Sequence, residues 1–258
     1  MNHTSAFFNA AHAAVRTVTN TALAAVLALV GCAAAQTPNG MPIRLSFDEP
    51  PWQAVQVGKN LTPNRFERRV WDGVDALEVH SAASMSLMAR PLTIDLEATP
   101  VLCWRWRIAQ VVPNADMNRR DSDDYAARVY VSFTLPPASM GVGVRTQLRL
   151  ARAIWGPNVP DAALNYVWDN RHSVGTERPN AYTDRAMMVV QRSGNHEAGR
   201  WMEERRDVRS DVARLFSAEA QAVQLAVTAD TDNTRQTAHA GFADFHFVAA
   251  DQGCQFPS

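Results

Sequence analysis

The sequence is poor in cysteine and lysine and carries no surplus of charge of either sign. Of its 258 residues three are cysteine and one, Lys59, is lysine, so arginine supplies almost all of the positive charge. The sequence has 25 basic and 26 acidic residues, which gives a formal net charge of −1. Because non-specific nucleic-acid binding depends on cationic neutralisation of phosphates, we expect no nucleic-acid partner. The arginine preference does not by itself indicate recognition.

Long hydrophobic runs are also missing. The longest apolar run, residues 22–30, is about half of the ~20 residues that a membrane-spanning helix needs. The composition, 47% hydrophobic and 20% charged, excludes a disordered chain and a collagen-like repeat. We therefore expect one globular domain.

The sequence lacks the common catalytic signatures. It contains no G-x-S-x-G, P-loop, H-E-x-x-H or C-x-x-C motif, and Gly141 and Gly143 lack the third glycine and the preceding strand of a nucleotide site. These absences favour a protein that is not an enzyme. A carboxylate-based hydrolase stays open as an alternative, because it needs only two acids that meet in space.

The N-terminus has the pattern of a secretory signal. Small residues follow the apolar run 22–30, and two processing routes compete. Residues 29–32 (LVGC) resemble a lipoprotein box, in which Cys32 would carry a lipid anchor; alternatively, residues 33–35 (AAA) direct ordinary cleavage before Gln36. Either route exports the chain, so we expect a periplasmic or lipid-anchored envelope protein that meets the membrane only through that anchor.

Only Cys103 and Cys254 survive both routes. An oxidising compartment would allow one disulfide between them; the alternative is a buried thiol in a strand and an exposed one near a frayed end. The expected organisation is a signal and processing region 1–35, a linker 36–42, a β-sandwich domain 43–250 and a tail 251–258.

Short runs with period-two alternation dominate the mature chain. In residues 102–108 the even positions are apolar, whereas the odd positions are Cys103, Arg105 and Arg107. Turn residues separate about ten such runs. The pattern predicts an all-β fold, a mostly antiparallel two-sheet sandwich of jelly-roll type.

Two stretches have helical spacing instead and predict two short inserted helices. The first, before Gly156, has apolar residues at i, i+4, i+7 and i+11, and the second follows a capping Asp207. Their apolar positions are Val144, Leu148, Ala151 and Trp155, and Val208, Val212, Leu215 and Phe216.

Two acidic clusters are candidate polar sites. Residues 121–124 (DSDD) lead into a strand and suit a divalent cation, acid–base chemistry or sugar hydroxyls. The alternative is an acidic turn paired with nearby arginines. Residues 230–234 (DTDNT) offer oxygen ligands for a structural Ca²⁺ through Asp230, Asp232 and Asn233, the one cofactor that we consider. A capped turn is the alternative there.

A third feature combines arginines with acids on strands whose other face is apolar. If Arg105, Arg107 and Arg128 line one sheet face with residues 201–207, they form an open groove for a glycan or an acidic ligand. Cross-strand salt bridges are the alternative. Trp168 precedes a polar loop and is either an aromatic platform at its rim or a core residue.

Six ordered blocks within residues 43–248 resemble a family of exported bacterial proteins classed as a domain of unknown function. The resemblance implies an exported β-rich domain and, more loosely, similarity to jelly-roll carbohydrate-binding modules. One departure is Arg235, where a small residue such as glycine is expected after the turn. The blocks are 102–108 (LCWRWRI), 123–131 (DDYAARVYV), 164–168 (LNYVW), 189–194 (VVQRSG), 201–208 (WMEERRDV) and 228–234 (TADTDNT).

The sequence therefore predicts a non-catalytic envelope protein that binds a saccharide, an envelope polymer or a similar polar ligand. One alternative is a hydrolase of an envelope polymer with Asp124 and Glu203 as acid and base. Another is a structural or assembly protein of the envelope. The predicted ligand-binding residues are Asp123, Asp124, Arg128, Trp168, Arg105 and Arg107.

Overall fold

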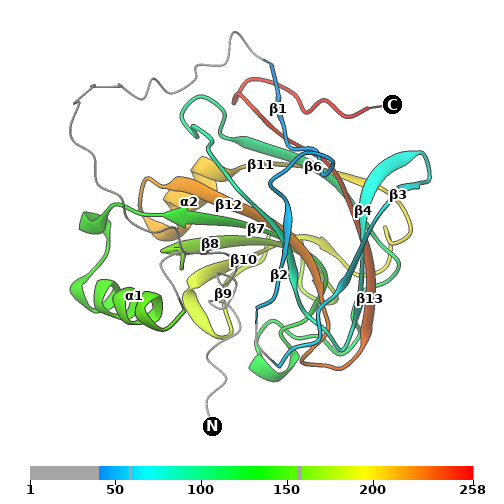
Figure 1. Cartoon of the computed structure of the whole chain (residues 1–258), viewed down its shortest axis with the longest axis horizontal. Helices are drawn as coiled ribbons and strands as arrows, with labels where there is room; N and C mark the ends of the chain where they lie inside the picture. Colours follow the sequence, from blue (N-terminus) through cyan, green and yellow to red (C-terminus); the bar gives the residue numbers. More distant parts are fainter. Residues whose placement is uncertain (1–40, 58–59, 156–158, 258) are drawn as a thin grey trace, which may run out of the picture.

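The computed structural model describes residues 41–57, 60–155 and 159–257, which form two β-sheets packed face to face (Figure 1). The predicted signal region, Cys32 and most of the predicted linker lie outside the described residues. The six-stranded sheet has the order β11 (Met202–Asp207), β6 (Val101–Ile108), β13 (Thr237–Val248), β4 (Val74–Ala82) and β3 (Arg65–Trp71), with β1 (Ile43–Arg44) beside β13.

The seven-stranded sheet lies against it. Its order is β2 (Gln53–Val55), β5 (Leu87–Pro91), β12 (Gln221–Asp230), β7 (Tyr125–Thr134), β8 (Ala162–Asp169), β10 (Thr183–Ser193) and β9 (Glu177–Asn180). Strands β8 and β10 are parallel, whereas the other paired strands of both sheets are antiparallel. The predicted all-β sandwich is confirmed.

Aromatic side chains fill the space between the sheets. Trp104 and Trp106 of β6 are fully buried and meet Tyr166 and Trp168 of β8, at ring-centroid distances of 5.5 and 5.7 Å. Successive strand residues point to opposite faces, so the even positions of β6 supply the core and the odd positions face outward.

Two α-helices lie between strands, as the spacing predicts: α1 (Val142–Trp155) and α2 (Val208–Phe216). The Asp207 carboxylate accepts a hydrogen bond from the Ser210 backbone N–H at 2.8 Å and so caps α2. Two short 3₁₀ helices, η1 (Arg120–Ser122) and η2 (Pro137–Ser139), complete the helical segments of the described residues. Among the described residues, no helix has both the length and the apolar character to span a bilayer.

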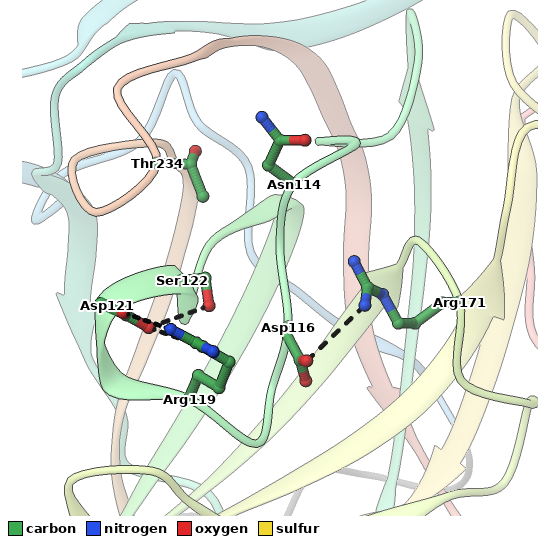
Figure 2. A pocket seen from close by; sticks show the side chains of 7 residues that line it. All are labelled: Asn114, Asp116, Arg119, Asp121, Ser122, Arg171 and Thr234. Atoms are coloured by element: carbon green, nitrogen blue, oxygen red, sulfur yellow. Dashed lines mark hydrogen bonds and ion pairs between the residues drawn. The ribbon is translucent and has the colours of Figure 1, made fainter.

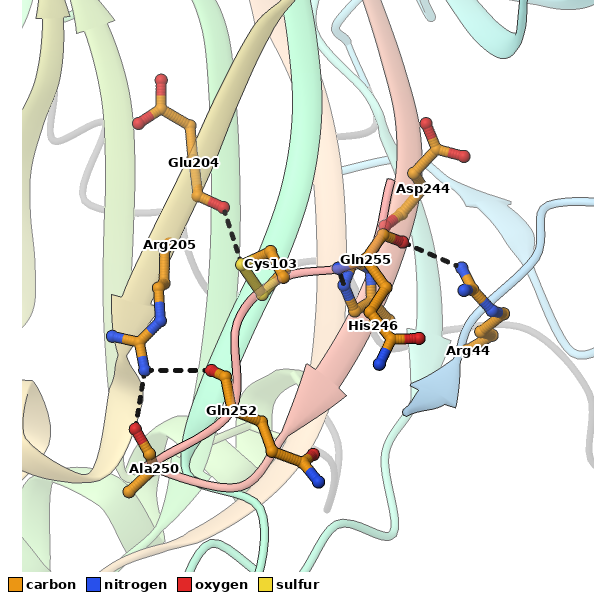
Figure 3. Close-up of a disulfide and its surroundings, with 10 residues drawn as sticks. Arg44, Cys103, Glu204, Arg205, Asp244, His246, Ala250, Gln252 and Gln255 are labelled. Carbon is orange, nitrogen blue, oxygen red and sulfur yellow. Dashed lines mark hydrogen bonds between the residues drawn. A yellow bond between two sulfur atoms is a disulfide. The ribbon is translucent and has the colours of Figure 1, made fainter. Parts of the chain in front are cut away.

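The C-terminal tail is held against the outer face of the six-stranded sheet (Figure 3). A disulfide joins Cys103 of β6 to Cys254, so the expected alternative of two free thiols is wrong. The tail also accepts a hydrogen bond at 2.8 Å from Arg205 to the Ala250 carbonyl, and its Gln255 N–H donates to His246 Nε2 at 3.0 Å. These contacts place the tail across β6 and β13.

Candidate ligand-binding site

The two acidic clusters of the sequence meet in the structure. Asp124 lies just before β7, and its carboxylate accepts hydrogen bonds from the turn that joins β12 to β13. The donors are the backbone N–H and side-chain amide of Asn233 and the backbone N–H and hydroxyl of Thr234, at 2.6–3.2 Å. Asp124 is buried and ties the two loops together.

Hydrogen bonds cap the turn 230–234, and its carboxylates lie close to that of Asp124. Asp124, Asp230 and Asp232 bring carboxylate oxygens within 4.8 Å of one another, but Asp124 is bonded to four donors and Asp230 to Arg128. Asn233 turns its amide N–H toward Asp124 instead of offering an oxygen ligand there. Asp230 Oδ1 is buried and has no hydrogen-bond partner among the described residues, so a Ca²⁺ ion at these carboxylates stays a prediction.

Arg235 keeps the backbone geometry for which a glycine was expected. Its φ is +57°, in the left-handed region that residues with a side chain rarely adopt.

Arg128 is buried in a charged network and does not line an open groove. Its side chain is 2% exposed, and Nη1 lies 2.6 Å from Asp230 Oδ2 and 3.9 Å from Asp123 Oδ2. The guanidinium also lies 4.7 Å from the ring centre of Tyr125 and 5.0 Å from that of Tyr130. The expected exposure of Arg128 is wrong, because loops cover this face of the seven-stranded sheet.

The covering segment packs through Met117. This buried side chain lies in one apolar cluster with residues of β7, β8 and β10 (Tyr125, Val167, Met188 and Val190). Strand alternation predicted correctly that Arg128 faces away from the central core. It could not show that the loop 109–124 would close over that face.

Burial and charge shift the pKa values of this network in opposite senses. Burial raises the pKa of Asp123 and of Asp230, and the attraction of Arg128 opposes the rise. Burial would lower the pKa of Arg128, but attraction to Asp123 and Asp230 outweighs it, so its pKa is raised. The network therefore keeps a buried cation against carboxylates that hold it in place.

Trp168 is a core residue and not a platform. It is 1% exposed, and its indole N–H donates to the Gly194 carbonyl at 3.0 Å. The interpretation of Trp168 as a stacking surface is wrong, and the core alternative describes its position.

Arg105 and Arg107 lie on the outer face of the six-stranded sheet, as alternation predicts, but they are engaged with neighbouring groups. Arg105 pairs with Asp244, and Arg107 lies 4.1 Å from the ring centre of Trp71 and donates to the Gly199 carbonyl at 2.8 Å. Because both guanidinium groups are already bound by these neighbours, Arg105 and Arg107 do not form the expected open groove.

The two carboxylates of the hydrolase alternative do not form a pair. Glu203 is exposed on β11, on the outer face of the six-stranded sheet, whereas Asp124 is buried beside Asn233 and Thr234. An acid and base pair must flank one bond of the substrate, so this arrangement does not support that mechanism.

A polar pocket of about 410 Å³ lies where the two sequence clusters meet (Figure 2). All of its lining residues are polar or charged: Asn114, Asp116, Arg119, Asp121, Ser122, Arg171 and Thr234. Asp121 and Ser122 come from the first cluster and Thr234 from the second, so residues more than 100 positions apart in the sequence share one site.

Ion pairs orient the charged side chains of the pocket wall. Arg119 donates to both carboxylate oxygens of Asp121, at 3.0 and 2.6 Å, and Arg171 lies 3.6 Å from Asp116. A hydrogen bond from Arg119 lowers the pKa of Asp121, and the Asn118 backbone N–H lowers that of Asp116. Both carboxylates are thus acceptors at neutral pH.

The loop 169–172 contributes a wall that sequence reasoning missed. Asn170 donates to the carbonyls of Pro113 and Ala115, at 3.0 and 2.9 Å, and so joins this loop to the loop that carries Asp116. Asp169 accepts a hydrogen bond from the Arg171 backbone N–H at 2.7 Å. The polar run Asp-Asn-Arg-His directly after β8 is the sequence signal that marks this wall.

Comparison with known proteins gives one family and a weak structural likeness. No curated protein matches the chain. The xyloglucanase domain of NopAA, a type three effector from Sinorhizobium fredii solved in complex with cellobiose, is similar over 77% of this chain and 92% of its own, with 10% identity and a TM-score of 0.37, too low to support an argument. Residues 50–246 match the family described as "Protein of unknown function (DUF3047)". The chain therefore belongs to the DUF3047 family.

Proposed function

We propose that this protein is an exported, non-catalytic envelope protein that binds a saccharide or a similar polar ligand in the pocket of Figure 2. The observation that carries the proposal is the lining of that pocket, in which every residue offers hydrogen-bonding groups. Its volume of about 410 Å³ lies within the range of small-molecule sites.

Charge balance favours a neutral ligand with many hydroxyl groups. The pocket has two carboxylates, Asp116 and Asp121, and two guanidinium groups, Arg119 and Arg171. Two negative and two positive groups create no strong preference for an anion or a cation. Carboxylates accept hydrogen bonds from hydroxyl groups and guanidinium groups donate to their oxygens, which is the pattern that a sugar presents.

The buried residues that the sequence predicted as ligand contacts have a supporting role in this proposal. Asp124 fixes the turn that carries Thr234, and Arg128 holds Asp123 and Asp230 beneath the loop. A site whose walls are held in place loses less conformational freedom when it binds.

Export is the second part of the proposal. The Cys103–Cys254 disulfide supports an oxidising compartment, where such bonds persist. Mass spectrometry of the mature N-terminus tests the two processing routes: an acylated Cys32 indicates a lipoprotein, a chain that begins at Gln36 indicates ordinary cleavage, and an unprocessed Met1 would contradict export.

A glycan array followed by calorimetry on the mature protein tests the binding site. Arg171→Ala and Asp121→Asn should each weaken binding of an array hit about tenfold or more, because a hydrogen bond to a charged group contributes ~1.5–3 kcal/mol. Arg209→Ala is the matched control, since Arg209 is 49% exposed like Arg171 and is paired with Glu97 away from the pocket.

The control variant should bind like the wild type. Binding that survives both pocket substitutions, or an array without hits, would contradict the proposed site. Release of sugar products during the titration would establish a hydrolase instead.

A further inference from the structure

Three chemically active side chains converge on the outer face of the six-stranded sheet, away from the pocket. Glu78 and His80 are two residues apart on β4 and therefore point to the same face. His239 of β13 is the direct cross-strand partner of His80. The register of these two strands thus places two imidazoles and a carboxylate side by side.

Their ligand atoms are close enough to share one ion. His239 Nε2 is hydrogen-bonded to Glu78 Oε1, His80 Nε2 lies 3.4 Å from the same oxygen, and all three atoms lie within 4.8 Å of one another. Ligands at ~2.1 Å around a tetrahedral Zn²⁺ lie about 3.4 Å apart. Only small shifts would bring the three atoms to that spacing.

The carboxylate of the cluster is buried, whereas its two imidazoles are partly exposed to solvent. The Glu78 side chain is 3% exposed, whereas those of His80 and His239 are 31% and 30% exposed. Solvent can therefore reach the imidazoles from outside the sheet, while the carboxylate is held at its surface.

Aromatic packing positions His239. Its ring stacks on Trp71, with centroids 4.5 Å apart and an interplanar angle of 14°. Trp71 and Trp201 lie directly over Gly241, where a Cβ would meet their ring atoms at 2.8–3.1 Å. Glycine at this position lets both indoles rest on the strand two residues from His239.

We propose that Glu78, His80 and His239 bind a divalent transition-metal ion of the Zn²⁺ class, with a coordination position open to solvent. Imidazole is a preferred ligand of Zn²⁺, Ni²⁺ and Cu²⁺. Two histidines and one glutamate are also a known ligand set of zinc sites that keep a fourth position for water or substrate.

Two local changes accompany binding. The rings of His80 and His239 are stacked, with centroids 4.2 Å apart at 15°, and they turn so that both Nε2 atoms face the ion. Arg69 lies 3.2 Å from Glu78 but is half exposed, so it can swing into solvent and give up its place to the ion. Glu67, the cross-strand partner of Glu78, is paired with Arg65, the cross-strand partner of His80, so this neighbouring ion pair adds no net charge to the site.

Titration of chelator-treated full-length protein with Co²⁺ and Zn²⁺ tests the proposal. Visible absorption of bound Co²⁺ reports imidazole coordination, and calorimetry with Zn²⁺ gives stoichiometry and affinity. We expect one ion per chain. His80→Ala and His239→Ala should each weaken binding more than about 100-fold, because even outer-shell partners contribute about 10–100-fold.

His196→Ala, which removes an exposed histidine elsewhere, should bind the ion like the wild type. Circular dichroism checks that each variant is folded, and if His239→Ala, which also loses the stacking on Trp71, is not, His80→Ala carries the test alone. Absence of saturable binding, or wild-type affinity in His80→Ala, would overturn the proposal; so would loss of binding in Asp232→Asn, which would place the ion at the acidic turn. Saccharide binding in the pocket is measured on the same chelator-treated protein, so the two proposals fail independently.

Discussion

Cys103 in β6 is covalently joined to Cys254, 151 residues later, and this bond fixes the C-terminal tail on the six-stranded sheet. A cross-link over so long a loop restricts the unfolded chain strongly. Cys254→Ser should therefore lower the free energy of unfolding by about 3–5 kcal/mol in urea denaturation. Under reducing conditions the wild type should be no more stable than Cys254→Ser. Equal stability of the two proteins without reductant would contradict the stabilising role of the disulfide.

His246 makes the stability of this region pH-dependent. The buried imidazole donates from Nδ1 to the Asp244 carbonyl at 2.6 Å and accepts from the Gln255 N–H at Nε2, so the neutral ring satisfies both contacts. Burial lowers the pKa of His246 below 6.5. The unfolded chain therefore takes up a proton that the folded protein resists.

The stabilisation from His246 is complete above pH 6.5 and is lost as the pH falls toward the lowered pKa of the folded state. The free energy of unfolding should decrease by at most ~1.4 kcal/mol per pH unit for this one proton. Urea denaturation between pH 7.5 and 5.5 measures the slope, which should be shallower in His246→Gln. An unchanged slope in that variant would contradict the assignment.

Arg128 is expected to support the fold and not to contact ligand. Arg128→Ala leaves the carboxylates of Asp123 and Asp230 buried without their cation. Removal of one partner from a buried ion pair costs about 3–5 kcal/mol. Arg209→Ala, in an exposed ion pair, should cost no more than ~1 kcal/mol in the same denaturation experiment, and similar losses in the two variants would refute the distinction.

Trp168 should behave as a core residue in the same experiment. Trp168→Ala removes a fully buried indole that packs on Trp106, so we expect a loss of about 3–5 kcal/mol. Trp168→Phe should lose less, since it keeps an aromatic ring in the space. If Trp168→Ala instead abolished saccharide binding and left the melting temperature unchanged, the platform interpretation would return.

Local patterns were enough to predict the architecture. Alternation in residues 102–108 places Trp104 and Trp106 on the core face because successive strand residues point to opposite sides. The spacing of Val208 and Val212 after Asp207 predicts α2 for the same kind of reason. The parallel pairing of β8 with β10 was not predicted, because alternation identifies the face of a residue and not the neighbour of its strand.

The candidate site depends on contacts that local patterns do not contain. Alternation separates Arg128 from the central core, but only the packing of Met117 shows that a loop covers it. Glu78 and His239 are 161 residues apart and meet through the register of β4 and β13. The acidic clusters were recognised as polar, whereas their junction at one pocket required the tertiary fold.

A crystal structure of the mature protein with a saccharide from the glycan array tests the central claim most directly. We predict sugar density in the pocket of Figure 2, with hydroxyl groups within hydrogen-bond distance of Asp121 and Arg171. Sugar density at another surface, with this pocket filled only by water, would contradict the account.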